Sequence, residues 1–253
     1  MPAEPTTRVF VGSEIELGET ISLPAEERSH VFKVLRGRTG DRIEVVDRRQ
    51  RLLVAELLDS GEASVVGELA SAEEPAGSIA LYQAVPKGRN MDTVVEKATE
   101  LGVTRIIPLF TERSVARPSG EGGKVDRWRR VAEAASRQSL QLRVPELCEP
   151  AVFLEVAASY GAGSTGIVLH NGPGLPEVED ALSGLEPEAP LGLFVGPEGG
   201  WSERELEAVE GGGLRLAQLG PYRLRSETAG IVAVSRAETG LRRARKSRGD
   251  RPS

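Results

Sequence analysis

The chain has 253 residues, of which 39% are hydrophobic and 28% charged, as is typical of a soluble globular protein with one large domain or two modest ones. It has no apolar run as long as a membrane span, no signal-peptide pattern at its start and one cysteine, Cys148, so we expect a cytoplasmic protein without an internal disulfide framework. Two histidines and one cysteine far apart lead us to expect no metal site, and the net charge of −6 argues against a general nucleic-acid binder.

Residues 1–72 show the pattern of short strands. The runs 8–11, 42–46 and 52–57 are apolar or alternate between apolar and polar side chains, and Gly-Asp and Ser-Gly turns separate them. One helical stretch lies among them, near 26–35. This pattern predicts a small β-barrel, and the composition of 71–78 predicts a linker to a second domain.

Two short segments are basic although the whole chain is acidic. Residues 28–51 hold eight basic side chains against three acidic ones, and residues 236–251 hold seven against two, so each has a local balance of +5. Such segments can neutralise RNA phosphates even on an acidic protein. A solvated surface without a ligand is the alternative, which the charges alone leave open.

Strands and helices alternate over residues 73–253, which predicts a parallel sheet covered by helices. The predicted strands are 79–85, 106–110, 167–170, 191–195 and a run through Leu214, Leu216 and Leu219. The predicted helices are 91–101, 125–139, 152–158, one after Ser202 and one from near Thr228. The stretch Gly161–Gly166 matches a dinucleotide-binding pattern, but a helical run precedes it and a strand follows, so we interpret it as a flexible loop.

A glycine-rich turn follows the predicted strand 191–195. Gly196-Pro197 ends the strand, and Gly199-Gly200 leave the turn free to take positive φ. Ser202 with Glu205 three residues later predicts a capping box at the start of the next helix. A strand, a glycine-rich turn and a capped helix are typical of a ligand loop, because backbone N–H groups come close to the ligand. An ordinary tight connection is the alternative.

A second segment of this kind spans 219–229, Leu-Gly-Pro-Tyr-Arg-Leu-Arg-Ser-Glu-Thr-Ala. An apolar strand again ends in Gly-Pro, and a short charged loop leads into a helix. Together with Gly196-Pro-Glu-Gly-Gly200, this segment resembles the RsmE-type 16S ribosomal RNA uridine-N3 methyltransferases of the SPOUT (trefoil-knot) superfamily. Further stretches follow the family, so that the likeness runs from about residue 8 to 236: His30–Asp41, Pro86–Asp92, Glu96–Val103, Pro108–Ser114, Glu133–Ser139 and Arg143–Pro145.

The resemblance implies an α/β fold with two domains. Residues 1–72 would form a PUA-like RNA-binding β-barrel, and residues 73–253 a parallel-sheet SPOUT methyltransferase domain whose backbone forms a trefoil knot. A knot departs from the usual rule of chain topology, so periodicity alone does not predict it. The superfamily also implies a homodimer in which the partner subunit completes each site.

S-adenosylmethionine is the cofactor that the resemblance implies, held mostly by loop backbone. Glycines let the backbone approach, and an adenine needs apolar walls with a few backbone donors and acceptors. The implied cofactor-binding residues are Leu169, His170, Gly196, Pro197, Glu198, Gly199, Gly200, Leu219, Gly220, Leu224, Arg225 and Thr228. For His170, a structural role at the strand end is favoured over a catalytic one.

The implied reaction gives 3-methyluridine in 16S ribosomal RNA. We expect the assembled small subunit to be the substrate, and free ribosomal RNA is the alternative that the sequence leaves open. N3 of uracil carries a proton at neutral pH, so cationic donors near the uracil oxygens would stabilise the anion that forms. Arg225 is the first candidate for this role and Arg223 the second. Glu227 would orient an arginine or accept the N3 proton; a helix-start ion pair between Arg225 and Glu227 is the alternative. A paired uridine must first be flipped out, because N3 lies on its Watson–Crick edge.

RNA binding is expected from the first domain, the basic segment 28–51 and stretches that match the family. The residues so implied are Arg28, His30, Lys33, Arg36, Arg38, Lys87, Arg89 and Arg143. Two other functions stay open: a SPOUT enzyme acting on a different RNA or base atom, and a non-catalytic RNA-binding ribosome-assembly factor. The second predicts eroded cofactor loops, whereas those of this chain are intact.

Overall fold

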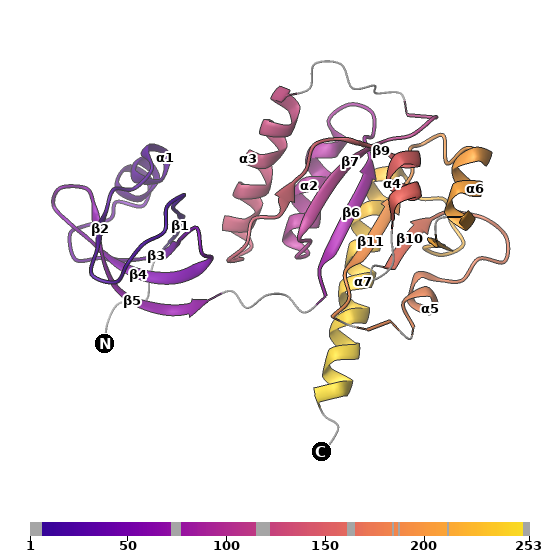
Figure 1. Ribbon diagram of the computed structural model, residues 1–253. Helices are drawn as coiled ribbons and strands as arrows, with labels where there is room; N and C mark the ends of the chain where they lie inside the picture. Colours follow the sequence, from indigo (N-terminus) through magenta and orange to yellow (C-terminus); the bar gives the residue numbers. More distant parts are fainter. Residues whose placement is uncertain are drawn as a thin grey trace. The chain divides into compact units, whose positions relative to one another are not determined.

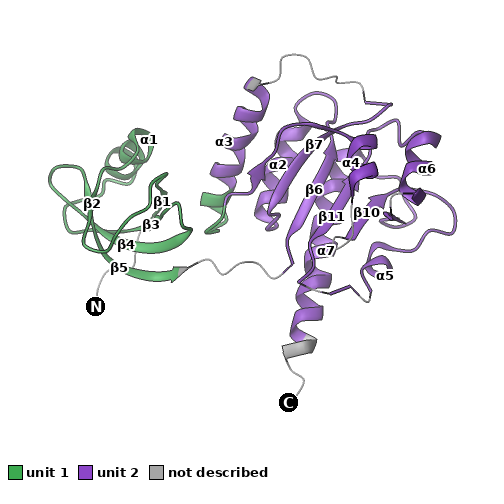
Figure 2. Ribbon diagram, in the orientation of Figure 1, with its two compact units in different colours: residues 1–74, 136–143 green, residues 75–135, 144–253 purple. Residues whose placement is uncertain are grey.

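The computed structural model describes residues 7–71, 77–114, 122–160, 165–183, 185–186, 188–211 and 213–249 (Figure 1). The chain forms two compact units, the first made of residues 1–74 and 136–143 and the second of residues 75–135 and 144–253 (Figure 2). Most of the predicted linker and of the predicted loop 161–166 lies outside the described residues, as does the predicted boundary between residues 72 and 73. Within the described part, no helix is long and apolar enough to cross a membrane.

A five-stranded sheet forms the frame of the first unit, in the order β1-β3-β4-β5-β2. β1 runs parallel to β3 and the other neighbours are antiparallel. Alternate residues turn inward, so that Val9, Ile43 and Leu53 are buried in one core. The described strands pair as an open sheet with β1 and β2 at its edges, and the closed PUA-like barrel stays a prediction. The strands are β1 Arg8–Phe10, β2 Thr20–Ile21, β3 Arg42–Val46, β4 Arg51–Leu57 and β5 Ala63–Ser71.

The helical stretch of this unit is not the single helix predicted for 26–35. It consists of α1, Ala25–Ser29, followed by a five-residue π-helical turn, η1, His30–Val34. The wider turn ends where the Leu35 N–H donates to the His30 carbonyl over 3.0 Å, and Arg36 then takes a positive φ of 58°. The segment therefore presents Val34 to solvent at 66% exposure, beside basic side chains.

Residues 136–143 join the first unit through polar contacts. Arg137 forms an ion pair with Glu27, whose side chain is 7% exposed. The Arg8 guanidinium donates to the Leu140 carbonyl. The pairing with Arg137 compensates the burial of the Glu27 carboxylate, which would otherwise be costly.

A parallel sheet forms the second unit and confirms the prediction made from alternating strands and helices. Its order is β12-β10-β11-β6-β7-β8, and β9 also pairs with β7. All these pairings are parallel. The strands are β6 Ile79–Ala84, β7 Arg105–Phe110, β8 Glu146–Leu147, β9 Ala151–Val152, β10 Thr165–Leu169, β11 Leu191–Val195 and β12 Arg215–Ala217.

Helices cover both faces of this sheet and bury two cores. α2, α3, α5 and α7 contribute to the larger core, and α4 and α6 to the smaller one, which contains Phe153, Phe194 and Trp201. The strand β11 is buried along its whole length because it lies between these cores. The helices are α2 Asn90–Glu100, α3 Gly122–Gln138, α4 Phe153–Ser159, α5 Val178–Leu182, α6 Glu203–Gly211 and α7 Ser226–Gly249.

Several observed bounds differ from the predicted ones, in short and long elements alike. The predicted strand through Leu214 and Leu219 shrinks to the three residues of β12, and α7 begins at Ser226, two residues before the predicted start. The short elements β2, β8, β9 and α5 were not predicted, because two to five residues are too few to show a period. The nine-residue strand β5 was not among the predicted strands either.

Three neighbouring strands position the candidate site. β12, β10 and β11 are adjacent, with Leu169 in register with both Ala217 and Val195. Because these strands are parallel, their carboxyl ends lie at one edge of the sheet. The loops that follow them therefore converge, although they are far apart in the sequence.

Candidate functional site

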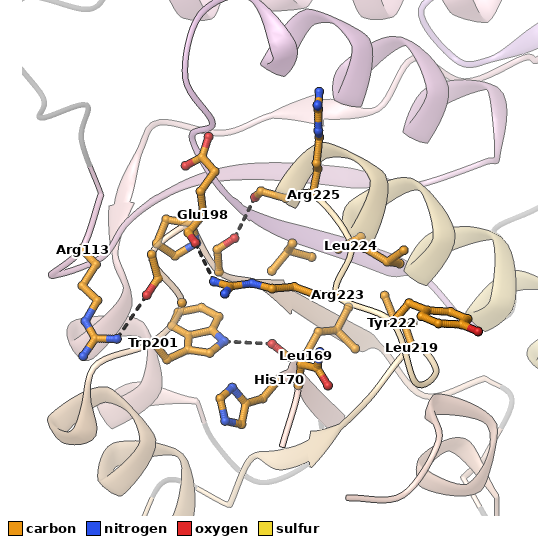
Figure 3. A pocket seen from close by; sticks show the side chains of 18 of the residues that line it. Arg113, Leu169, His170, Glu198, Trp201, Leu219, Tyr222, Arg223, Leu224 and Arg225 are labelled. Carbon is orange, nitrogen blue, oxygen red and sulfur yellow. Dashed lines mark hydrogen bonds between the residues drawn. The ribbon is translucent and has the colours of Figure 1, made fainter. Parts of the chain in front are cut away.

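A cavity of about 690 Å³ lies where the three loops converge (Figure 3). It belongs entirely to the second unit. Its size is that of a pocket for a small-molecule ligand. The lining residues are Arg113, residues 169–171, residues 195–201, residues 219–220 and 222–226, and Ala229.

The glycine-rich turn after β11 forms one wall of the cavity. Gly200 takes a positive φ of 69° and its N–H donates to the Pro197 carbonyl over 2.9 Å, which closes a tight turn. At Gly196 a Cβ would lie 3.0 Å from the Trp201 ring, so a side chain there would displace the indole. The turn thus needs glycine at Gly200 for its backbone angle and at Gly196 for space.

The capping box predicted at Ser202 and Glu205 is confirmed. The Ser202 N–H donates to the Glu205 carboxylate over 2.8 Å, and the Glu205 N–H donates back to the Ser202 hydroxyl over 3.1 Å. The second carboxylate oxygen accepts the N–H of Glu112 over 2.9 Å. Glu205 therefore ties the start of α6 to the loop after β7, which carries Arg113.

Arg113 lies against the glycine-rich turn from that loop. Its guanidinium donates to the Gly199 carbonyl over 3.1 Å, and a Cβ at Gly199 would lie 3.2 Å from the Cβ of Arg113. Gly199 itself does not take the positive φ that the sequence allowed; its small size is what this contact requires. A cation thereby stands at the cavity wall.

Trp201 links two of the loops. Its indole is 4% exposed, and its N–H donates to the Leu169 carbonyl at the end of β10 over 2.9 Å. The bond fixes the ring across the floor between β10 and β11 (Figure 3). A buried aromatic ring with a satisfied N–H gives the cavity a rigid apolar surface.

The third loop, between β12 and α7, carries the predicted cations. Gly220 takes a positive φ of 112°, and Tyr222 is 82% exposed on the rim. The Arg223 guanidinium donates to the Glu198 carbonyl over 2.9 Å and so reaches across to the glycine-rich turn, whereas the exposed Arg225 points away from it (Figure 3).

Most predicted cofactor residues line the cavity together. Eleven of the twelve do so, and Thr228 is the exception. Of the three predicted catalytic residues, Arg223 and Arg225 line the cavity, and Glu227 does not. The Glu227 carboxylate instead accepts a hydrogen bond from the Asn90 amide at the start of α2 over 3.1 Å. The expected pairing of Glu227 with an arginine is not seen among its described contacts.

His170 lies in the cavity wall directly after β10. Burial lowers the pKa of its imidazole below the usual value of 6.5, so the ring is neutral at pH 7. A neutral ring adds no charge to a cavity that already has Arg113, Arg223 and Arg225 in its lining.

The predicted RNA-binding residues are distributed over both units. Arg28, His30, Lys33, Arg36, Arg38 and Arg143 belong to the first unit, whereas Lys87 and Arg89 belong to the second. All except the half-buried Arg143 are exposed. The Lys87 N–H donates to the Glu198 carboxylate over 3.0 Å, which places the loop after β6 next to the glycine-rich turn.

Several residues that line the cavity were not predicted from the sequence. Trp201 directly follows the glycine-rich turn and Ser226 sits inside the second matched segment, so their proximity was a usable signal. Arg113 lies in a stretch that matched the family, but nothing in its spacing connects it with Gly199, 86 residues away. The missed lining residues are Arg113, Asn171, Val195, Trp201, Tyr222, Ser226 and Ala229.

The arrangement suits an uncharged planar ring with polar edges. Apolar side chains such as Leu169 and Trp201 face the cavity, loop backbone supplies N–H and C=O groups, and cations stand at the rim. In the described part of the chain, no three His, Cys, Asp or Glu side chains gather as metal ligands would. Apolar walls with main-chain donors and acceptors around them are what an organic ligand needs.

Comparisons with known proteins point to one family. A family model described as an RNA methyltransferase domain matches residues 72–238. The ribosomal RNA small subunit methyltransferase E of Mycobacterium bovis is 30% identical over 238 residues, which cover 89% of this chain and 88% of that protein.

Two solved structures with bound S-adenosylmethionine are also similar. A methyltransferase from Legionella pneumophila has a TM-score of 0.81 and 28% identity, covering 93% of this chain and 98% of that one. The ribosomal RNA small subunit methyltransferase E of Neisseria gonorrhoeae has a TM-score of 0.81 and 27% identity, covering 92% of this chain and 97% of that one.

Proposed function

The chain belongs to the RNA methyltransferase family that includes ribosomal RNA small subunit methyltransferase E, and we propose that it methylates N3 of one uridine in 16S ribosomal RNA. The observation that carries this proposal is the cavity at the carboxyl ends of β10, β11 and β12, most of whose lining residues come from the two segments that resemble the family, 196–200 and 219–229. An RNA-binding protein without catalysis would have no use for so complete a cavity.

S-adenosylmethionine fits the residues present. A Cβ at Gly196 would lie 3.0 Å from the Trp201 ring and one at Gly199 3.2 Å from the Arg113 Cβ, so each is a tight contact that glycine relieves, and the loops bring their main-chain groups close to the cavity. Leu169, Trp201 and Leu219 would hold the adenine between apolar surfaces. When bound, this cofactor supplies a methyl group on a sulfonium, which N3 of uracil takes as its proton leaves.

The cations of the third loop would act on the uracil. Guanidinium groups near O2 and O4 lower the free energy of the anion and so favour loss of the N3 proton. Arg223 is already held at the cavity by the Glu198 carbonyl, whereas Arg225 must turn inward to take part. We therefore place Arg223 ahead of Arg225 as the stabilising cation, reversing the order inferred from the sequence.

In this proposal Glu227 has a structural role and not a catalytic one. Its carboxylate holds Asn90 outside the cavity lining, so it orients the start of α7 against α2 rather than accepting the N3 proton. Thr228 lies on the same turn, outside the lining.

Recognition of the RNA would fall to the first unit. Its exposed segment 30–38 carries His30, Lys33, Arg36 and Arg38 beside the exposed Val34, a combination suited to phosphates and unstacked bases. The PUA-like barrel, the trefoil knot of the second unit, the homodimer and the cytoplasmic location belong to the same proposal and rest on the family resemblance.

Nucleoside mapping by mass spectrometry tests this function directly. Small-subunit ribosomal RNA from cells that lack the gene should miss one 3-methyluridine, and the purified protein with S-adenosylmethionine should restore it. Arg223→Ala should fail to restore it, whereas Arg204→Ala, a matched change of an exposed α6 side chain outside the cavity, should succeed. Loss of a different modification instead would refute the uridine-N3 assignment.

A further inference from the structure

A buried glutamine joins two of the three loops that form the cavity. Gln83 lies near the end of β6, in register with Val195 of β11, and its side chain is fully buried. Its amide Nε2 donates to the Ser226 hydroxyl over 2.9 Å and to the Ala84 carbonyl over 3.0 Å. The Ser226 hydroxyl donates in turn to the Gly196 carbonyl over 2.7 Å.

The hydrogen bonds from Gln83 to Ser226 and from Ser226 to Gly196 can have only one donor–acceptor direction. The Ser226 hydroxyl has a single hydrogen, and the Gly196 carbonyl, which can only accept, takes it. Ser226 Oγ must therefore accept from Gln83, which requires the amide nitrogen to face it. The chain Gln83–Ser226–Gly196 thus runs from β6 through the first residue of α7 to the first residue of the glycine-rich turn.

The Gln83 amide oxygen occupies space that a side chain at residue 230 would otherwise fill. The other amide atom, Oε1, has no hydrogen-bond partner among the described residues, and a Cβ at Gly230 of α7 would lie 2.2 Å from it. An unpaired buried oxygen is costly, and an apolar side chain in this place would avoid that cost. Stability of the core therefore does not explain a glutamine here, nor a glycine at the fifth residue of α7.

We propose that Gln83 is a positioning residue that holds the Gly196 turn and the 219–226 loop in register through Ser226, so that both present their backbone to the cofactor. This role rests on the proposed function, because it deepens the account of the same site. Gln83 does not line the cavity, so its effect on the cofactor passes through Ser226 and Gly196.

Calorimetric binding of S-adenosylmethionine to the full chain tests the proposal. Gln83→Met keeps the side-chain length and removes the amide, and Ser226→Ala deletes one oxygen and leaves the fold intact. Each should raise the Kd about fivefold or more, as expected for one lost hydrogen bond. The double variant should be no weaker than the weaker single variant, because both changes break the same chain. The KM for the cofactor should rise while kcat stays near wild type.

Two further variants separate positioning from stability. Gly230→Ala should reproduce the weaker binding, because it forces the amide to turn away while every hydrogen-bonding group is retained. Thr99→Val removes a buried hydroxyl that donates to the Val95 carbonyl within α2, so it should lower the melting temperature and leave the Kd unchanged.

The results separate a failure of the proposed function from a failure of the positioning role of Gln83. If the wild type does not bind S-adenosylmethionine, the proposed function is wrong and the positioning role falls with it. If the wild type binds and folded Ser226→Ala binds equally well, the positioning role alone is wrong. A Thr99→Val variant that weakens binding as much as Ser226→Ala would likewise overturn the role, since general loosening would then explain the effect.

Discussion

Replacing Glu205 by glutamine should destabilise the second unit far more than the same change on the surface. The Glu205 side chain is 1% exposed, and its two carboxylate oxygens accept the backbone N–H groups of Ser202 and Glu112. A glutamine amide has one oxygen, so one of these N–H groups must then face an NH₂ group. The change replaces the charged acceptor and leaves one of the two N–H donors, of the buried Ser202 or of the exposed Glu112, without its partner.

The size of the effect follows from these contacts. Loss of a hydrogen bond to a charged group costs about 1.5–3 kcal/mol. Loss of the negative charge at the start of α6 costs about 0.3–1 kcal/mol more. The free energy of unfolding should therefore fall by about 2–4 kcal/mol, which at an m-value of about 2 kcal/mol/M lowers the urea midpoint by about 1–2 M.

Tryptophan fluorescence during urea unfolding reports on the second unit, which contains Glu205. Both tryptophans, Trp128 and Trp201, belong to the second unit. Glu210→Gln on the same helix is the matched control, since this side chain is exposed and the change should stay within about 0.5 kcal/mol. Equal midpoints for the two variants would show that the buried carboxylate does not hold α6 and the 111–114 loop as argued.

Other perturbations test the cavity, the core and the RNA surface. Trp201→Phe removes the N–H that binds the Leu169 carbonyl and should weaken S-adenosylmethionine binding about fivefold by calorimetry; an unchanged Kd would contradict its role in fixing the cavity floor. Burial raises the pKa of Tyr160 to about 12, so the stability that this phenol contributes is complete below pH 10 and is lost as the pH rises to about 12. The difference between the absorbance titrations of the wild type and Tyr160→Phe isolates this phenol among the three tyrosines. It should ionise together with alkaline unfolding, and a Tyr160 phenol that titrates near 10 in the folded protein would refute this. Reversing the charge of Arg36 and Arg38 should weaken RNA binding at least tenfold in a filter assay and spare cofactor binding; unchanged RNA affinity would remove the 30–38 segment from the interface.

The sequence predicted best what depends on local patterns. The parallel arrangement of the second unit follows from alternating strands and helices, and the capping box follows from Ser202 and Glu205, three residues apart. The open five-stranded sheet of the first unit was harder to predict from the sequence, because its edge strand β2 has only two residues. The change from α1 to a π-helical turn at His30 depends on hydrogen bonds that a helical period does not distinguish.

The sequence by itself indicated two loops of the candidate site, those after β11 and β12, because glycine, proline and capping residues act through the conformation of their own segment. The loop after β10 was inferred from the family resemblance. Only the tertiary structure decided which side chains meet in the site. It brought Arg113 to Gly199, turned Glu227 to Asn90 and joined Gln83 to Ser226, 143 residues away. The physical reason is that these contacts depend on the order and register of the parallel strands, which bring distant segments to one edge of the sheet and are not encoded in any single segment.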